Sequence, residues 1–228
     1  MGVASGNTSG HLPPTEAPYT CSLCPRLAAF LGAQREREPT WYNGPVKSFG
    51  PDDARLLIVG LAPGLRGANR TGRPFTGDYA GTLLYGTLLE FGLASGVFDA
   101  RPDDGLILND TMITNAVRCV PPENKPTPAE INTCRSFLSA RVAGLPQLRI
   151  VLALGRIAHD SILTTLGHRK SANAFAHGAR HELIGPNGQT MLLHDSYHCS
   201  RYNTNTGRLT TEMFRQVFGA IVTDLDAT

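Results

Sequence analysis

Short apolar runs alternate with longer segments of helical periodicity along most of this chain. Four runs rich in Val, Ile and Leu are each bounded by Gly, Pro or polar residues: "RLLIVGL" at 55–61, "DTMITNAV" at 110–117, "LRIVLALG" at 148–155 and "TMLLH" at 190–194. Their length and continuous hydrophobicity are typical of strands that are buried on both faces of a sheet.

Helical patterns lie between and after these runs. The segments with this periodicity are 81–93, 127–145, which opens with a Thr-Pro-x-Glu cap signature, 155–167 and 211–225. Strands that alternate with helices predict a parallel sheet covered by helices on both faces. Because such sheets bind ligands at the carboxyl ends of their strands, we expect "GLAPG" at 60–64 and "HDSYHC" at 194–199 to meet at one edge.

Length and composition predict one globular domain. The chain has 228 residues, of which 41% are apolar and 18% charged. We expect residues 1–18 to form a flexible leader and 19–228 the domain. The first 20 residues have neither a basic start nor an apolar core, and no run of 18 apolar residues follows, which predicts a cytoplasmic protein with no membrane segment. A net charge of +2 excludes a strongly basic DNA-coating protein, so any polyanion site must be local.

The glycine-rich loop after the first run, "GLAPGLRGANRTGRPFTGD" at 60–78, is a candidate binding loop. Its glycine spacing fits neither a dinucleotide-binding fingerprint nor a Walker loop. The glycines instead allow the backbone to approach a flat ligand. Phe75 is suited either to stack on such a ligand or to plug the core beneath the loop. Asp78 directly precedes a predicted helix, where Asp is a favoured N-cap.

The cysteines fall into two separated pairs. Cys21 and Cys24 form a C-x-x-C, whereas Cys119 and Cys134 are separated by 14 residues. A four-thiolate site of this kind suits zinc or a [4Fe-4S] cluster, and the ligands alone do not decide between them. The long gap departs from a zinc ribbon and favours the cluster; unliganded thiols are the alternative. Cys199 lies apart from both pairs.

Three segments together resemble the signature segments of the family 5 uracil-DNA glycosylases, which are iron-sulfur members of the uracil-DNA glycosylase superfamily. These segments are "GLAPGLRGANRTGRPFTGD", "NAVRCVPPENKPTP" and "HCSRYNTNTGRLT", and the resemblance runs from Cys21 to Leu225. It implies a single three-layer α/β/α domain with a four-stranded parallel central sheet. It also implies a [4Fe-4S] cluster on Cys21, Cys24, Cys119 and Cys134.

The activity that the resemblance implies is that of a monofunctional DNA glycosylase. Such an enzyme hydrolyses the N-glycosidic bond of uracil, and of other deaminated bases such as hypoxanthine, and so initiates base excision repair at the abasic site. Matched by motif, the catalytic residues are Asp78 and His198; His194 lies four residues earlier, but "HCSRYNT" is the better match. The best-known enzymes of the superfamily carry an aspartate early in the first motif, where this chain has Ala62. This difference places the acid-base role on Asp78.

The resemblance assigns base binding to the loop and to the Pro-rich segment. Phe75 would stack on the flipped base, and Asn124 of "PPENKP" would pair with its amide edge, although Asn124 also suits a turn. The backbone around Ala62, Pro63 and Gly64 would line the pocket and offer amide donors to the departing base.

Basic residues near these segments are candidate DNA contacts. We expect Arg201 and Tyr202 to act as a wedge or as phosphate contacts, and Arg66, Arg70 and Arg73 to contact phosphates beside the lesion. A solvated basic loop and an exposed turn are the alternatives. The expected partner is double-stranded or single-stranded DNA with uracil or another deaminated base, bound by a monomer.

Two other functions remain open at this point. One is a non-catalytic iron-sulfur module that binds nucleic acid or carries electrons, in which Asp78 only caps a helix. The other is a family 4 type glycosylase with strict uracil specificity, which is expected to carry an acidic residue where this chain has Ala62.

Overall fold

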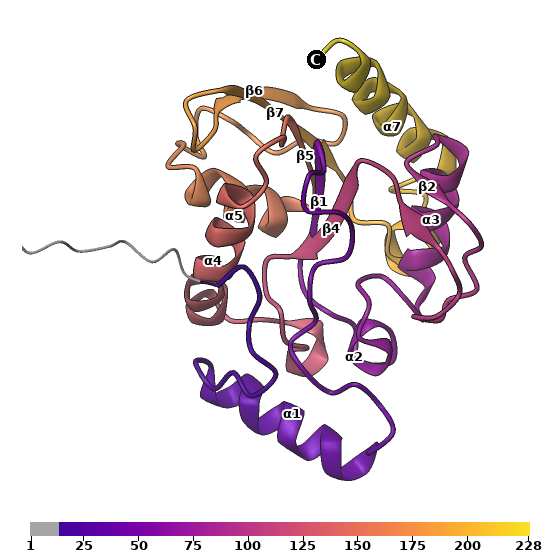
Figure 1. Cartoon of the computed structure of the whole chain (residues 1–228), viewed down its shortest axis with the longest axis vertical. Coiled ribbons are helices and arrows are strands. Elements are labelled where there is room, and N and C mark those ends of the chain that lie inside the picture. The colour runs from indigo at the N-terminus through magenta and orange to yellow at the C-terminus, as the bar shows by residue number, and fades with distance from the viewer. Residues whose placement is uncertain (1–13) are drawn as a thin grey trace, which may run out of the picture.

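The central sheet of the computed structural model, which describes residues 14–228, has five strands (Figure 1). Their order across the sheet is β4 (Thr111–Asn115), β1 (Leu56–Gly60), β5 (Ile150–Leu154), β7 (Thr190–Ser196) and β6 (Arg180–Ile184). The first four are parallel to their neighbours and coincide with the four predicted runs. Every residue of β1, β4 and β5 is buried, which explains their continuous hydrophobicity.

The predicted strand number of four is wrong, because β6 adds a fifth strand. It pairs antiparallel with β7 at the edge of the sheet. Its sequence, "RHELI", contains a single buried residue, Leu183, and so lacks the apolar run that marks the other strands. Charged side chains on an edge strand also hinder pairing with another chain.

Helices cover both faces of the sheet and form the predicted three layers. On one face α3 (Tyr79–Glu90) and α7 (Thr211–Asp226) pack on alternate strand residues such as Leu56 and Ile58. On the other face α4 (Pro128–Ala143) and α5 (Arg156–Thr165) pack on Leu57 and Val59. A capping box at Thr127 and Glu130 starts α4, as the Thr-Pro-x-Glu signature predicts.

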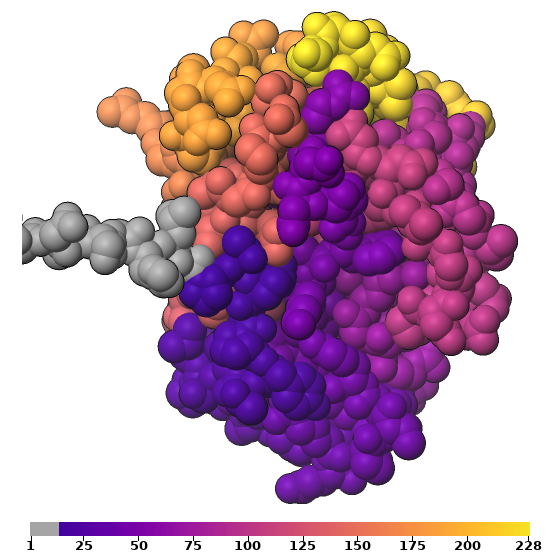
Figure 2. All heavy atoms as spheres, viewed as in Figure 1, coloured from indigo at the N-terminus to yellow at the C-terminus, as the bar shows by residue number. Residues whose placement is uncertain are grey.

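The remaining elements lie outside these layers. They are α1 (Pro25–Arg37), α2 (Ala68–Thr71), the 3₁₀ helix η1 (Pro122–Asn124), α6 (Arg201–Asn205) and the antiparallel pair β2 (Ala94–Ser95) and β3 (Ile107–Leu108). In the space-filling view α1 and α7 lie at opposite ends of the molecule (Figure 2).

Part of the predicted leader packs against the domain. Arg141 of α4 donates to the Thr15 hydroxyl at 3.0 Å and pairs with Glu16, and Ala17 is buried. Residues 1–13 of the predicted leader lie outside the described residues. No helix within 14–228 combines the length and the apolar character that crossing a bilayer requires.

Candidate functional site

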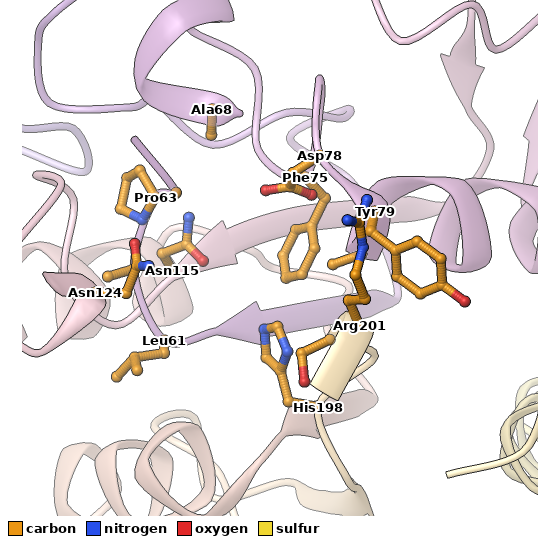
Figure 3. A pocket seen from close by; sticks show the side chains of 14 residues that line it. Leu61, Pro63, Ala68, Phe75, Asp78, Tyr79, Asn115, Asn124, His198 and Arg201 are labelled. Atoms are coloured by element: carbon orange, nitrogen blue, oxygen red, sulfur yellow. The ribbon is translucent and has the colours of Figure 1, made fainter. Parts of the chain in front are cut away.

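A pocket of about 470 Å³ opens where the parallel strands end. It collects side chains from the loop after β1, the start of α3, the end of β4, η1 and the segment before α6 (Figure 3). Eight of the residues singled out from the sequence line it: Ala62, Pro63, Gly64, Phe75, Asp78, Asn124, His198 and Arg201. The expected meeting of the first loop and the β7 end is therefore confirmed.

Asp78 both caps α3 and faces the pocket. Its Oδ1 accepts a hydrogen bond from the Gly81 amide at 3.3 Å, as the N-cap interpretation predicts. No Lys, Arg or His within residues 14–228 forms an ion pair with the carboxylate. Burial therefore raises the pKa of Asp78, and its hydrogen bonds to backbone amides oppose that rise only in part. A buried carboxylate without a cation is a marker of a functional site.

Two loop glycines lie against this carboxylate. A Cβ atom added to Gly67 would be 2.4 Å from Asp78 Oδ2, and one added to Gly64 would be 3.0 Å from the same oxygen. The backbone of the loop thus approaches Asp78 more closely than any side chain would allow. Because glycine has no side chain, these two positions leave room for Asp78 Oδ2 beside the pocket.

Phe75 belongs to the core beneath the loop and also lines the pocket. Its ring is only 6% exposed. The His198 ring lies 5.9 Å from it, centroid to centroid, at an interplanar angle of 28°. A Cβ atom on Gly60, the last residue of β1, would be 2.7 Å from the Phe75 ring. The backbone at Phe75 is left-handed, with φ of 52°, which is unfavourable for an aromatic residue.

A buried ion pair holds the Phe75 segment in this conformation. Both terminal nitrogens of Arg73 donate to Asp104 at 2.8 Å, and its Nε donates to the Thr76 hydroxyl at 2.7 Å. The Tyr85 hydroxyl donates to the Pro74 carbonyl at 2.7 Å. Arg73 is therefore buried, and each of its three guanidinium nitrogens already donates a hydrogen bond within the protein. This arrangement does not fit the expected contact of Arg73 with phosphate.

His198 is held near the pocket floor by its backbone and is neutral at ordinary pH. The Asn203 amide donates to the His198 carbonyl at 2.8 Å, which anchors the segment before α6. Withdrawal from water lowers the pKa of His198 to about 4. His194, the other candidate, lies instead in β7, where its Nε2 is 2.8 Å from Asp224 Oδ2, and it does not line the pocket.

Asn115 is a pocket residue that we did not single out from the sequence. It ends β4 directly beside Gly60, is only 3% exposed, and has no hydrogen bond from its side chain to another described residue. The available signal was its polar side chain at the carboxyl end of a run predicted to be buried. Asn124 lines the same pocket from η1, with a left-handed backbone that Asn tolerates. The two asparagines thus face one cavity from two elements.

The remaining predicted DNA contacts lie around the pocket. Arg201 places its guanidinium 5.3 Å from the centre of the Tyr79 ring and lines the pocket, whereas Tyr202 is 72% exposed and points away from the core. Arg66 and Arg70 are exposed on the loop and on α2, and neither lines the pocket.

A buried network fixes β7 behind His198. Asp195 accepts from His159 of α5 at 2.7 Å and from His181 of β6 at 3.2 Å, each through a different oxygen. The other ring nitrogen of His159 lies 2.8 Å from the Asn173 carbonyl. Both partners of His159 accept hydrogen bonds, which favours the doubly protonated ring, and these bonds raise the pKa of His159 although burial opposes the rise. The network links α5 and β6 to β7, the strand that leads into His198.

The four paired cysteines surround a second, small cavity. Cys21 and Cys24 come from the segment before α1, Cys119 from the loop after β4, and Cys134 from α4. Burial, followed by their mutual repulsion as thiolates, raises the pKa of Cys119 to about 12, while burial raises that of Cys134 to about 11. Within residues 14–228 only His159, His181 and Asp195 bring three possible ligand atoms within 4.8 Å of one another.

Comparison with known proteins decides the family. The family model described as the uracil DNA glycosylase superfamily matches residues 47–221. The chain belongs to this superfamily. The type-5 uracil-DNA glycosylase of Thermus thermophilus is 49% identical over 203 residues, which cover 86% of this chain and 90% of that protein.

Two uracil-DNA glycosylases of one organism, one of type 5 and one of type 4, differ in how much of this chain they match. The type-5 uracil-DNA glycosylase of Pyrobaculum aerophilum is 37% identical over 208 residues, or 90% of this chain. The type-4 uracil-DNA glycosylase of the same organism is 34% identical over 115 residues, or 50% of this chain. The resemblance to family 5 of the uracil-DNA glycosylase superfamily is therefore confirmed.

Proposed function

We propose that this uracil-DNA glycosylase superfamily member hydrolyses the N-glycosidic bond of uracil in DNA and leaves an abasic site for base excision repair. The observation that carries the proposal is Asp78, a partly buried carboxylate that faces the pocket of about 470 Å³ and has no cation partner among residues 14–228. A lone cap residue needs no such cavity beside it.

Cleavage of this bond builds positive charge on the sugar and negative charge on the departing base. The Asp78 carboxylate stabilises the sugar cation and orients or deprotonates the attacking water. Its Oδ1 is occupied by the Gly81 amide, so Oδ2 is the atom that takes this role. Because burial raises the pKa of Asp78, activity is lost on acidification at a higher pH than for an exposed aspartate.

His198 stabilises the departing base as a neutral donor. With a pKa of about 4 the ring carries one proton above that pH, so it donates a hydrogen bond to the base oxygen without first giving up a charge. The backbone amides of Ala62 and Gly64, which also line the pocket, would add further donors, whereas Pro63 has no N–H group.

The geometry of the rings supports a specific pose for the base. A base inserted between Phe75 and His198 would need about 7 Å, or two stacking distances of about 3.5 Å each. The observed separation is 5.9 Å. We therefore place the base against Phe75, with His198 at its edge and with the Asn115 and Asn124 amides available to its other polar atoms.

The target nucleotide must leave the base stack to reach this pocket. Arg201 and Tyr202 at the pocket rim are suited to hold the strand or to fill the gap. Ala62 presents no charge to the base, so we extend the proposed substrates to hypoxanthine and other deaminated bases, in duplex or single-stranded DNA. The protein would act as a monomer in the cytoplasm.

The four paired cysteines would hold a [4Fe-4S] cluster. The 14-residue gap between Cys119 and Cys134 departs from a zinc ribbon, and because burial raises the pKa of Cys24, Cys119 and Cys134, a cationic group is needed to keep them as thiolates. The Arg118 amide already donates to the Cys134 sulfur at 3.3 Å, a contact typical of cluster sites. When bound, the cluster would supply a link between α1, α4 and the β4 loop.

The test of the activity is incubation of the purified protein with labelled duplexes that carry one uracil or one hypoxanthine, followed by alkali and a sizing gel. We expect alkali-dependent cleavage at uracil. Absence of cleavage at both bases, from protein with a full iron content, would instead support the non-catalytic binding module.

Substitution Cys119→Ser tests the cluster. We expect loss of iron and a lower melting temperature, because one ligand and its link between elements are removed. Cys199→Ser is the matched control, since Cys199 is equally buried but distant from the cysteine cavity. Full iron content in the Cys119 variant would show that the ligand set is wrong.

A further inference from the structure

Five arginines within residues 14–228 lie over aromatic rings: Arg35, Arg73, Arg156, Arg201 and Arg208. Two of them have other partners, since Arg73 pairs with Asp104 and Arg35 donates to two backbone carbonyls. The guanidinium groups of the other three have neither an ion pair nor a hydrogen bond to any described residue. Among these, only Arg201 has been placed in the site so far.

Arg156 and Arg208 both adjoin the wall that carries His198. Arg156 follows Gly155, whose amide bonds to the Ser196 carbonyl at 2.8 Å and whose added Cβ would be 3.7 Å from that of His198. Arg208 lies 4.6 Å from the centre of the Tyr197 ring, directly before His198 in sequence. The two arginines therefore lie on the His198 side, whereas Arg201 lies on the Tyr79 side beside Asp78.

A platform of rings supports these two side chains. The Arg156 guanidinium lies 5.6 Å from the Phe175 ring centre, and Phe175 contacts Tyr197 at 6.2 Å. The Tyr197 ring also stacks on the His177 ring, with the two centroids 5.0 Å apart. Stacking fixes the plane of a guanidinium while leaving its N–H edge free. An arginine held in this way loses little entropy when it binds an anion with paired oxygens.

We propose that Arg156 and Arg208 bind backbone phosphates of the DNA on the His198 side of the pocket. The platform of Phe175, His177 and Tyr197 holds them for this contact. The inference rests on the proposed function, because it takes DNA as the occupant. Phosphate oxygens match the free edge of a stacked guanidinium, and neither arginine has a carboxylate to neutralise it.

The experiment measures binding of undamaged duplex DNA as a function of salt for Arg156→Ala, Arg208→Ala and the double variant. Each lost contact should reduce the slope of log affinity against log salt by about 0.9 and weaken binding several-fold at low salt. The matched control is Arg149→Ala, which removes the same charge at the other end of β5. Arg156→Lys should recover only part of the affinity, because lysine keeps the charge but loses the stacked plane.

Base release is measured separately, so that the two proposals fail independently. We expect the double variant to raise KM for a uracil duplex and to leave kcat unchanged, with a melting temperature equal to that of the parent. A salt slope equal to that of Arg149→Ala would overturn the phosphate contact even if uracil is released. A reduced slope without any base release would retain the contact and overturn the glycosylase activity.

Discussion

Asp78 and Asp104 are two carboxylates close to the same loop, and their surroundings are opposite. The Asp104 side chain is withdrawn from solvent and accepts hydrogen bonds from both terminal nitrogens of Arg73, which hold the pKa of Asp104 well below its ordinary value. Asp78 is partly buried and has backbone amides but no cation, and burial raises its pKa. The comparison shows that withdrawal of a carboxylate from water marks a candidate functional residue where no cation neutralises it.

The Arg73–Asp104 ion pair also holds the segment that carries Phe75 and Asp78. Arg73 bonds Thr76 and thereby holds the segment that places Phe75 in a left-handed conformation and Asp78 at the helix start. An unfavourable backbone conformation persists only where its surroundings impose it. The ion pair between Arg73 and Asp104 is therefore the support of the pocket rather than part of its chemistry.

The largest effect on activity is expected for Asp78→Asn. Asparagine caps a helix about as well as aspartate, so the fold should remain, but the charge that stabilises the sugar cation is lost. We expect a fall of about 10²- to 10⁴-fold in the single-turnover rate of uracil release. Thermal unfolding of the variant provides the control. An unchanged rate would show that Asp78 only caps α3. The difference in function between Asp78 and Asp104 would then not hold.

Asp104→Asn should act on stability first. It leaves the buried Arg73 guanidinium without its counter-charge, and removal of one partner from a buried pair costs about 3–5 kcal/mol. The free energy of unfolding, from urea titration, measures this loss. Asp99→Asn is the control, because Asp99 is 68% exposed and its pair with Arg101 contributes little. A small stability change at Asp104, comparable to that at Asp99, would contradict the support role.

Gly67→Ala tests the close approach of the loop to Asp78. The new Cβ would be 2.4 Å from Oδ2, so the carboxylate or the loop must move. A displacement of about 1 Å at a reacting group costs on the order of 10²-fold in rate. Gly86→Ala is the control, since a Cβ there meets no atom within 4 Å and lies inside α3, where alanine favours the helix. Equal rates for the two variants would show that Oδ2 is not the reacting oxygen.

Local patterns in the sequence predicted the parallel strands, because a buried strand is marked by its own residues, whereas the family resemblance supplied most of the pocket residues. The four apolar runs became β1, β4, β5 and β7, and the carboxyl ends of parallel strands necessarily share an edge. The strand β6 has no apolar run, since only Leu183 is buried. A strand of that kind is recognised only through its pairing with β7.

Contacts between distant residues account for what the sequence did not predict. Arg73 looked like one of three loop arginines, yet Asp104, 31 residues later, removes it from the surface. The cysteine pairs could be recognised in the sequence as candidate metal ligands because their chemistry is distinctive. The hydrogen bond between His159 and Asp195 spans 36 residues and is marked by no motif. Burial and partnership are properties of the folded chain.

The smallest effect is expected for His159, which, like Asp104, has partners that favour its charged form. Burial opposes this charge, but the hydrogen bonds to Asp195 and Asn173, with Asp160 nearby, outweigh burial and raise the pKa of the ring above its ordinary value. A group whose pKa is raised by folding stabilises the fold fully below its unfolded pKa, near 6.5, and this contribution is lost as the pH rises through the folded value. The parent should therefore lose stability toward alkaline pH more steeply than His159→Gln, by at most about 1.4 kcal/mol per pH unit for one proton.

The control variant is His181→Gln, because His181 shares Asp195 with His159. His181 has one hydrogen bond to this carboxylate and no second acceptor, so His181→Gln should keep the loss of stability at alkaline pH. Parallel unfolding curves for the parent and His159→Gln between pH 6 and 9 would show that the ring is neutral, and the link between α5 and the His198 strand would then need no charge.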